Sequence, residues 1–198
     1  MERKIITISR EYGSGGRYIG EEVAKRLGIA YYDKKIIAQT AEKTGLAEEY
    51  IEEKGEYAPS SSFFAYAFVG RHSDGSSIDD YLYAAQRQII LDVAEQGPCV
   101  IIGRCADYIL RDREDCLHIF VHGNEEAKVR RIMELYHVSE TEAKRQLKFV
   151  DKKRSTNYNY YTDRKWGVTQ NYMLSMNSSE LGYETCIEMI CSLVKPRG

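Results

Sequence analysis

Short apolar runs alternate with amphipathic stretches along most of this chain. The runs are bounded by Gly, Pro, Asn or Asp, which is typical of buried strands. Residues 99–102 are continuously apolar, as in a central strand of a parallel sheet. The expected strands are residues 4–9, 28–33, 99–102, 116–121 and 171–177.

The stretches between these runs carry apolar residues at helical spacing. Ile19, Val23 and Leu27 recur on one face of a helix, and Asn124 and Ser139 stand where side chains cap later helices. Strand–helix alternation predicts an α/β fold with a parallel sheet. The expected helices are residues 18–27, 34–43, 46–54, 79–96, 125–136, 139–151 and 178–193.

A glycine-rich turn, residues 10–17, joins the first strand to the first helix. Glycines allow positive φ and bring backbone amides close to an anion, while the helix N-terminus adds partial positive charge. A phosphate site is predicted here, with a ligand-free β–α turn as the alternative. The predicted phosphate-binding residues are Gly13, Ser14, Gly15, Gly16, Arg17 and Tyr18.

The turn departs from the Walker A pattern, G-x-x-x-x-G-K-[ST]. If Gly15 is the second glycine of the pattern, Arg10 stands at the first glycine, Gly16 at the lysine and Arg17 at the Ser/Thr. Both the lysine that would reach the β- and γ-phosphates and the hydroxyl that would hold Mg²⁺ are therefore missing.

Further candidate residues follow two other strands. Asp33 ends the second strand, where ligand-contacting side chains lie in open α/β sheets; capping the next helix is an alternative, and both can hold. Arg104 and Asp107 follow residues 99–102, and here ligand contact is favoured over a surface ion pair.

Composition narrows the function classes. A length of 198 residues fits a single domain, residues 1–198, and a net charge of −2 does not indicate nucleic-acid binding. No run approaches the roughly 18 apolar residues of a membrane helix, and no signal peptide is expected. The five cysteines lack C-x-x-C spacing, and none of the four histidines is spaced from them as a second metal ligand would be. We therefore expect no metal site, a cytoplasmic protein with reduced cysteines, and a core position for His118.

Residues 55–77 differ in character from the rest of the chain. They include a serine run and an aromatic patch at 63–68. Long irregular segments inside compact domains are usually functional or mobile, which predicts a flap near the ligand. A contact in a homodimer is the alternative.

Five segments together resemble the cytidylate kinase-like family of P-loop kinases. These are residues 6–17, 31–34, 103–107, 151–154 and 171–172. The resemblance covers nearly the whole chain. It implies a three-layer P-loop kinase fold, with a parallel central sheet flanked by helices and a helical lid at about 138–167. It also implies phosphoryl transfer from ATP, with Mg²⁺, to CMP, dCMP or a related nucleotide.

The same resemblance implies roles for individual residues. Arg17 would stand in for the missing lysine, and Arg104 would contact the acceptor nucleotide. Asp33 would position the acceptor or hold Mg²⁺ through water. Arg154, helped by Lys152 and Lys153, would close over the transferring phosphoryl group. Without the resemblance, residues 152–154 would be interpreted as a solvated basic helix end.

Departures from the family pattern leave other functions open. In the Asp-Gly-Arg-Asp motif of cytidylate kinases, Ile102 and Cys105 stand at the two aspartates, and Asp107 is out of register. The alternatives are a catalytically weak or inactive nucleotide-binding protein with a degenerate loop, and a kinase of a non-nucleotide small molecule.

Overall fold

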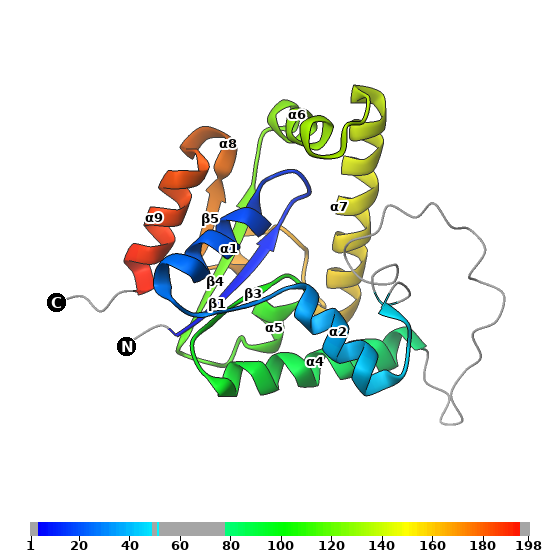
Figure 1. Ribbon diagram of the computed structural model, residues 1–198, viewed down its shortest axis with the longest axis vertical. Coiled ribbons are helices and arrows are strands. Elements are labelled where there is room, and N and C mark those ends of the chain that lie inside the picture. The colour runs from blue at the N-terminus through cyan, green and yellow to red at the C-terminus, as the bar shows by residue number, and fades with distance from the viewer. Residues whose placement is uncertain (1–3, 49–50, 52–77, 195–198) are drawn as a thin grey trace.

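The computed structural model describes residues 4–48, 51 and 78–194. The predicted flap at 55–77, and most of the helix expected at 46–54, lie outside these residues. The described chain forms three layers, a central sheet with helices on both faces (Figure 1). This is the α/β fold predicted from the alternation of strands and helices.

Five parallel strands form the sheet, in the order β2-β3-β1-β4-β5. The three central strands are buried over nearly their whole length, as their apolar sequences predict. The strands are β1 (Ile5–Arg10), β2 (Ala30–Tyr32), β3 (Cys99–Ile102), β4 (Cys116–His122) and β5 (Leu174–Asn177).

Helices cover the two faces of the sheet with different partners. α1 (Gly16–Leu27) and α9 (Tyr183–Val194) pack with alternate strand residues in one core cluster. α4 (Ile78–Gln96) and α5 (Ala106–Ile109) pack with the intervening strand residues in a second cluster on the other face. The other helices of the described ranges are α2 (Lys34–Thr44), α6 (Glu125–Tyr136), α7 (Glu140–Thr162) and α8 (Ser178–Leu181), with a 3-10 turn at Thr169–Asn171.

Helix α7 is much longer than the sequence pattern predicted. It runs for 23 residues, so the expected end near residue 151 is wrong. Its buried residues Leu147, Val150, Arg154, Tyr158 and Thr162 keep a spacing of three or four. The inward face continues through an arginine, a tyrosine and a threonine, residues that do not count as an apolar stripe in a sequence.

Other helix ends also differ from expectation. The final helix is divided by Gly182, which has φ +78°, into α8 and α9. Asn124 precedes α6 but its side chain makes no capping hydrogen bond. The Ser139 oxygen accepts the Glu142 amide at 3.3 Å, so the predicted cap of α7 is confirmed.

Two predictions about the core are confirmed. All five cysteines are buried thiols. His118 lies in the sheet, where its Nδ1 is 2.8 Å from Thr7 Oγ1. No helix in the described ranges is long and apolar enough to span a bilayer.

Candidate active site at the glycine loop

The glycine loop, residues 10–17, lies at the carboxyl end of β1 and leads into α1. Gly13 and Gly15 have φ of +77° and +78°, which non-glycine residues rarely adopt. A Cβ on Gly13 would lie 2.8 Å from the Lys128 carbonyl oxygen, and one on Gly15 would lie 2.6 Å from the Tyr183 ring. Gly15 opens α1 without a side-chain cap. The loop therefore has the backbone expected of a phosphate cradle.

The loop is held in place by its own polar groups and by two neighbouring elements. The Glu11 carboxylate accepts hydrogen bonds from the Gly123 amide at 3.2 Å and from Lys128 Nζ at 2.7 Å. Ser14 Oγ donates to the Glu11 carbonyl at 2.8 Å, and Ser178 Oγ donates to the Ser14 carbonyl at 2.6 Å. The Ser14 hydroxyl thus donates within the loop, and the phosphate contact expected of Ser14 stays a prediction.

Two side chains of helix α7 make hydrogen bonds to the main chain of the loop. Asp151 Oδ1 accepts the Tyr12 amide at 2.7 Å, and Arg154 Nη1 donates to the Arg10 carbonyl at 3.0 Å. Arg154 Nη1 also lies 3.7 Å from Asp151 Oδ1. Burial raises the pKa of Asp151 to about 6, although the Arg154 charge opposes the shift. The predicted catalytic residue Arg154 is therefore buried against the loop.

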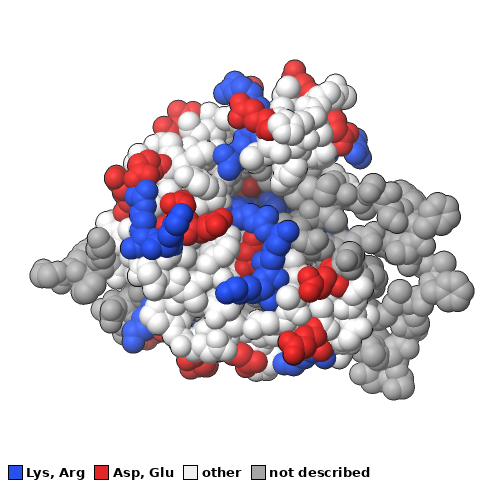
Figure 2. Space-filling model, in the orientation of Figure 1, with Lys and Arg blue, Asp and Glu red and all other residues white. Residues whose placement is uncertain are grey.

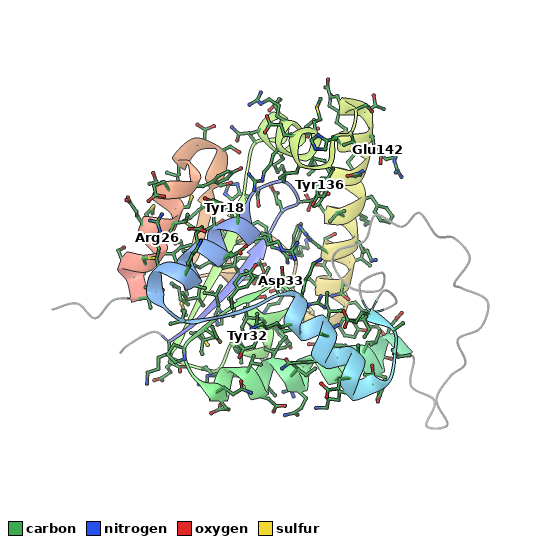
Figure 3. The ribbon with its side chains drawn as sticks, viewed as in Figure 1. Tyr18, Arg26, Tyr32, Asp33, Tyr136 and Glu142 are labelled. Carbon is green, nitrogen blue, oxygen red and sulfur yellow. The ribbon has the colours of Figure 1, made fainter. Side chains whose placement is uncertain are left out.

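Tyr12 joins the glycine loop to the α6–α7 pair. Its ring stacks on Tyr136 with centroids 6.0 Å apart, and the Arg154 guanidinium lies 5.8 Å from its centroid. Tyr12 also packs against a small core cluster that includes Val129 and Leu147. Figure 3 shows Tyr136 at the end of α6, close to the loop. A movement of α6 or α7 would therefore displace Tyr12 and, with it, the glycine loop.

Arg17 and Asp33 meet at the start of α1. Arg17 Nε forms an ion pair with Asp33 Oδ2, and the two side chains are 45% and 2% exposed. Asp33 stands at the N-cap position of α2 but makes no capping hydrogen bond. Figure 3 shows Asp33 near the centre of the molecule, between α1 and α2. The capping hydrogen bond of the alternative interpretation is thus not made, and ligand contact by Asp33 stays a prediction.

Arg104 and Asp107 follow the carboxyl end of β3, and Asp107 also contacts the carboxyl end of β1. Both are buried, and Arg104 has φ +55°. Asp107 accepts hydrogen bonds from Ser9 Oγ at 3.3 Å and from the Tyr158 hydroxyl at 2.6 Å. Asp107 thus joins β1, α5 and α7, and its contact with an acceptor stays a prediction. The contact predicted for Arg104 also stays a prediction.

The basic residues predicted on α7 divide between two faces. Arg154 lies on the buried face, whereas Lys152 is exposed and Lys153 is half-buried. The structure brings Arg17, Asp33 and Arg154 to the glycine loop but leaves Lys152 on the solvent side. Lys and Arg side chains nevertheless gather in a band between α1, α2 and α7, in the middle of the face in Figure 2. Acidic side chains lie around this band on the same face.

Several residues at the loop were not predicted from the sequence. Asp151 lies one helical turn before Arg154, and Glu11 is an acid inside a glycine loop, so both carried a signal that could have been used. Tyr183, whose ring covers Gly15, carried none. Its partner is 168 positions away along the chain, and only folding brings the two together.

The residues at the loop do not fit a Walker-type Mg²⁺ site. Mg²⁺ prefers hard oxygen ligands. The hydroxyl position of the pattern holds the cation Arg17, and the nearest predicted carboxylate, Asp33, is already paired with it. Across the described ranges, no three His, Cys, Asp or Glu side chains gather as they would around a metal ion.

A sequence model of the Cytidylate kinase-like family matches residues 5–180. The chain belongs to this family. The resemblance inferred from the glycine loop and the later segments is thereby confirmed. Membership supports a nucleotide-binding, kinase-like function. It also suggests, in general terms, that a nucleotide and Mg²⁺ are used. No match was found among curated protein sequences.

Solved structures confirm the fold. An uncharacterized protein from Eubacterium ventriosum ATCC 27560 is 26% identical with a TM-score of 0.72, over 98% of this chain and 100% of that one. Shikimate kinase from Bacteroides thetaiotaomicron is 15% identical with a TM-score of 0.56, over 96% and 97%. Shikimate kinase from Acinetobacter baumannii, in complex with shikimate, is 13% identical with a TM-score of 0.55, over 97% and 93%. The three-layer P-loop kinase fold is therefore shared with the two shikimate kinases.

Proposed function

We propose that this protein transfers the γ-phosphoryl group of ATP to a nucleoside monophosphate, with CMP and dCMP as the first candidates. One observation carries the proposal: the glycine loop ends in Arg17, at the start of α1, and Arg154 from α7 donates to the Arg10 carbonyl of the same loop. Phosphoryl transfer depends mainly on positioning and on neutralising charge, and this arrangement can supply both.

In the proposed reaction, an oxygen of the acceptor phosphate forms a bond to the γ-phosphorus of ATP. The bond from that phosphorus to the β–γ bridging oxygen breaks, and ADP leaves. Backbone amides of residues 13–17 would hold the donor phosphates, and Arg154 would offset the charge on the transferring group. Arg104, beyond the end of β3, would bind the acceptor phosphate.

The test measures ADP release from ATP and Mg²⁺ with a panel of acceptors. The panel holds CMP, dCMP, UMP, AMP and GMP, and it includes shikimate because two shikimate kinases share the fold. We expect release to depend on the acceptor and to be fastest with CMP or dCMP. ATP without an acceptor gives the background rate.

Arginine variants assign the acceptor site. Arg104→Lys keeps the charge but loses the planar fork, so we expect a higher KM for the acceptor with ATP binding unchanged. Arg111→Lys, at an exposed arginine that stacks on Tyr108, is the matched control. If both variants behave alike, Arg104 has no role in acceptor binding.

A second candidate function is nucleotide binding without transfer. It is favoured by Gly16, the lysine position of the pattern, where a Cβ would lie 2.6 Å from Arg10 Cβ. This second candidate would be supported if ATP raises the melting temperature of the protein while no acceptor increases ADP release.

We further propose that the protein acts in the cytoplasm on nucleotides, without nucleic acid or membrane as partner; a homodimer stays a prediction.

A further inference from the structure

Arg17 occupies an unusual place for a cation in a glycine loop. It stands at the position of the Walker Ser/Thr, one residue after the lysine position. We propose that the Arg17 guanidinium, held by Asp33, performs the charge-neutralising role of a loop-bound Mg²⁺, so that nucleotide binding needs little Mg²⁺. This inference rests on the proposed nucleotide-binding function.

The ion pair explains how the guanidinium is positioned. Arg17 lies in the first turn of α1 and Asp33 lies directly after β2, so the pair joins the loop to the end of an edge strand. Asp33 is 2% exposed, which leaves its carboxylate little freedom to move. The Tyr31 hydroxyl also donates to the Arg17 carbonyl at 3.4 Å. The ion pair therefore holds the Arg17 side chain at Nε, and the Tyr31 hydrogen bond holds its main chain.

The chemistry of the guanidinium suits this role. Arginine has five N–H donors in a planar fork, so it can donate to a carboxylate and to a phosphate together. Its Nε is the atom paired with Asp33, and 45% of the side chain is exposed. A phosphate at the loop would meet a fixed positive charge, as it would meet a metal ion.

The structure separates this role from that of the missing lysine. The lysine position is Gly16, where Arg10 Cβ lies 2.6 Å from an ideal Cβ. Arg17 is at the next position, and its partner Asp33 is the carboxylate that the family resemblance offered for Mg²⁺. Position and partner both point to replacement of the metal and not of the lysine.

The experiment is calorimetric titration of the full chain with ATP, once with excess MgCl₂ and once with excess EDTA. We expect the wild-type dissociation constants in the two buffers to agree within about threefold. For Arg17→Thr/Asp33→Asn we expect binding in EDTA to weaken by about tenfold or more, the usual scale of a charge-assisted hydrogen bond. Addition of MgCl₂ should then restore part of the affinity.

The double variant is used because Arg17→Thr alone would leave a buried carboxylate without its partner and could unfold the protein. Arg17→Lys is a second variant, which keeps the charge and loses the fork. Arg26→Ala is the matched control, since Arg26 also lies on α1 and is paired with a carboxylate, Glu184. Figure 3 shows Arg26 at the opposite end of that helix. Thermal melting of each variant checks that it is folded.

The outcomes separate this inference from the proposed function. Wild-type binding that weakens more than about tenfold in EDTA overturns the inference and leaves nucleotide binding intact. A double variant with the same Mg²⁺ dependence as the wild type also overturns it. No ATP binding by the wild type in either buffer overturns the proposed function, and the inference fails with it.

Discussion

At the scale of single residues, Arg10 and Gly16 form a complementary pair. The Walker pattern has a glycine at the first of these positions and a lysine at the second. Here the large residue is on the strand and the small one is on the helix, with Arg10 Cβ 2.6 Å and Val121 Cβ 3.2 Å from an ideal Cβ on Gly16. A side chain at position 16 would therefore overlap Arg10 unless Arg10 were also replaced by a smaller residue.

Gly16→Lys should therefore destabilise the protein instead of repairing its loop. We expect a loss of about 1–3 kcal/mol in the free energy of unfolding, the usual cost of overpacking, measured by urea denaturation. Arg10→Gly/Gly16→Lys should lose less than the sum of the two single variants, because the space is then available. Strictly additive losses would show that the two positions are independent.

Asp151 gives a prediction about pH. Burial raises its pKa to about 6, from an ordinary value near 3.8. The folded state thus binds a proton more tightly than the unfolded state, and this contribution to stability is lost as the pH rises from about 4 to about 6. Asp151→Asn keeps an oxygen for the Tyr12 amide and removes the titration.

We expect the stability of Asp151→Asn relative to the wild type to rise by up to about 3 kcal/mol between pH 4 and pH 7. Chemical denaturation at several pH values measures this difference. Arg154, Glu11 and Lys128 also face the carboxyl group, and they are the same in both proteins. A difference in stability that is constant with pH would contradict the raised pKa.

At the scale of elements, α7 connects the glycine loop to the second core cluster. Its buried face carries Arg154 to the loop and Tyr158 to Asp107. Burial and the neighbouring Asp107 charge raise the pKa of Tyr158, so its hydroxyl stays protonated and donates to the carboxylate. The helix therefore supports the glycine loop and Asp107, and in the proposed reaction it also supplies the Arg154 cation.

Tyr158→Phe tests this support. Loss of the hydroxyl removes a hydrogen bond from the buried Asp107 carboxylate, and we expect a loss of about 1–3 kcal/mol in the free energy of unfolding. Tyr160→Phe is the control on the same helix, because Tyr160 is 69% exposed. Equal effects of the two substitutions in urea denaturation would contradict a structural role for the Tyr158 hydroxyl.

At the scale of the whole molecule, the two core clusters share one sheet. α9, near the C-terminus, packs on α1 over one face of the sheet. Trp166 packs against the cluster on the other face, and its ring meets the Phe120 ring edge-on with centroids 5.4 Å apart. Because successive residues of β1 and β3 alternate between the clusters, neither cluster can be lost without disturbing the sheet. The described chain should unfold as one unit.

Ile190→Ala tests this cooperativity from the face opposite Trp166. Ile190 is fully buried in the cluster of α1 and α9, so we expect a loss of about 2–5 kcal/mol. The fluorescence of the single tryptophan and far-UV circular dichroism should report the same denaturation midpoint. Two separate midpoints would show that the clusters unfold independently.

Much of the fold was predictable because the relevant signals are local. A continuous apolar run predicted β3, a mostly apolar run predicted β4, and glycines predicted the turn before α1. The length of α7 was not predictable in this way, because Arg154 and Tyr158 are buried by partners far away in the sequence. A residue's polarity predicts its burial only when no distant partner satisfies its polar atoms.

The sequence by itself determined the strand–helix order, the glycine loop and the absence of the Walker lysine and hydroxyl. Only the tertiary structure decided what stands in their place: Arg10 fills the space over Gly16, Asp33 holds Arg17, and Asp151 holds the Tyr12 amide. The physical reason is that glycine conformation and helix propensity act over a few residues. Ion pairs and close packing depend instead on which strand ends and helices the folded sheet brings together.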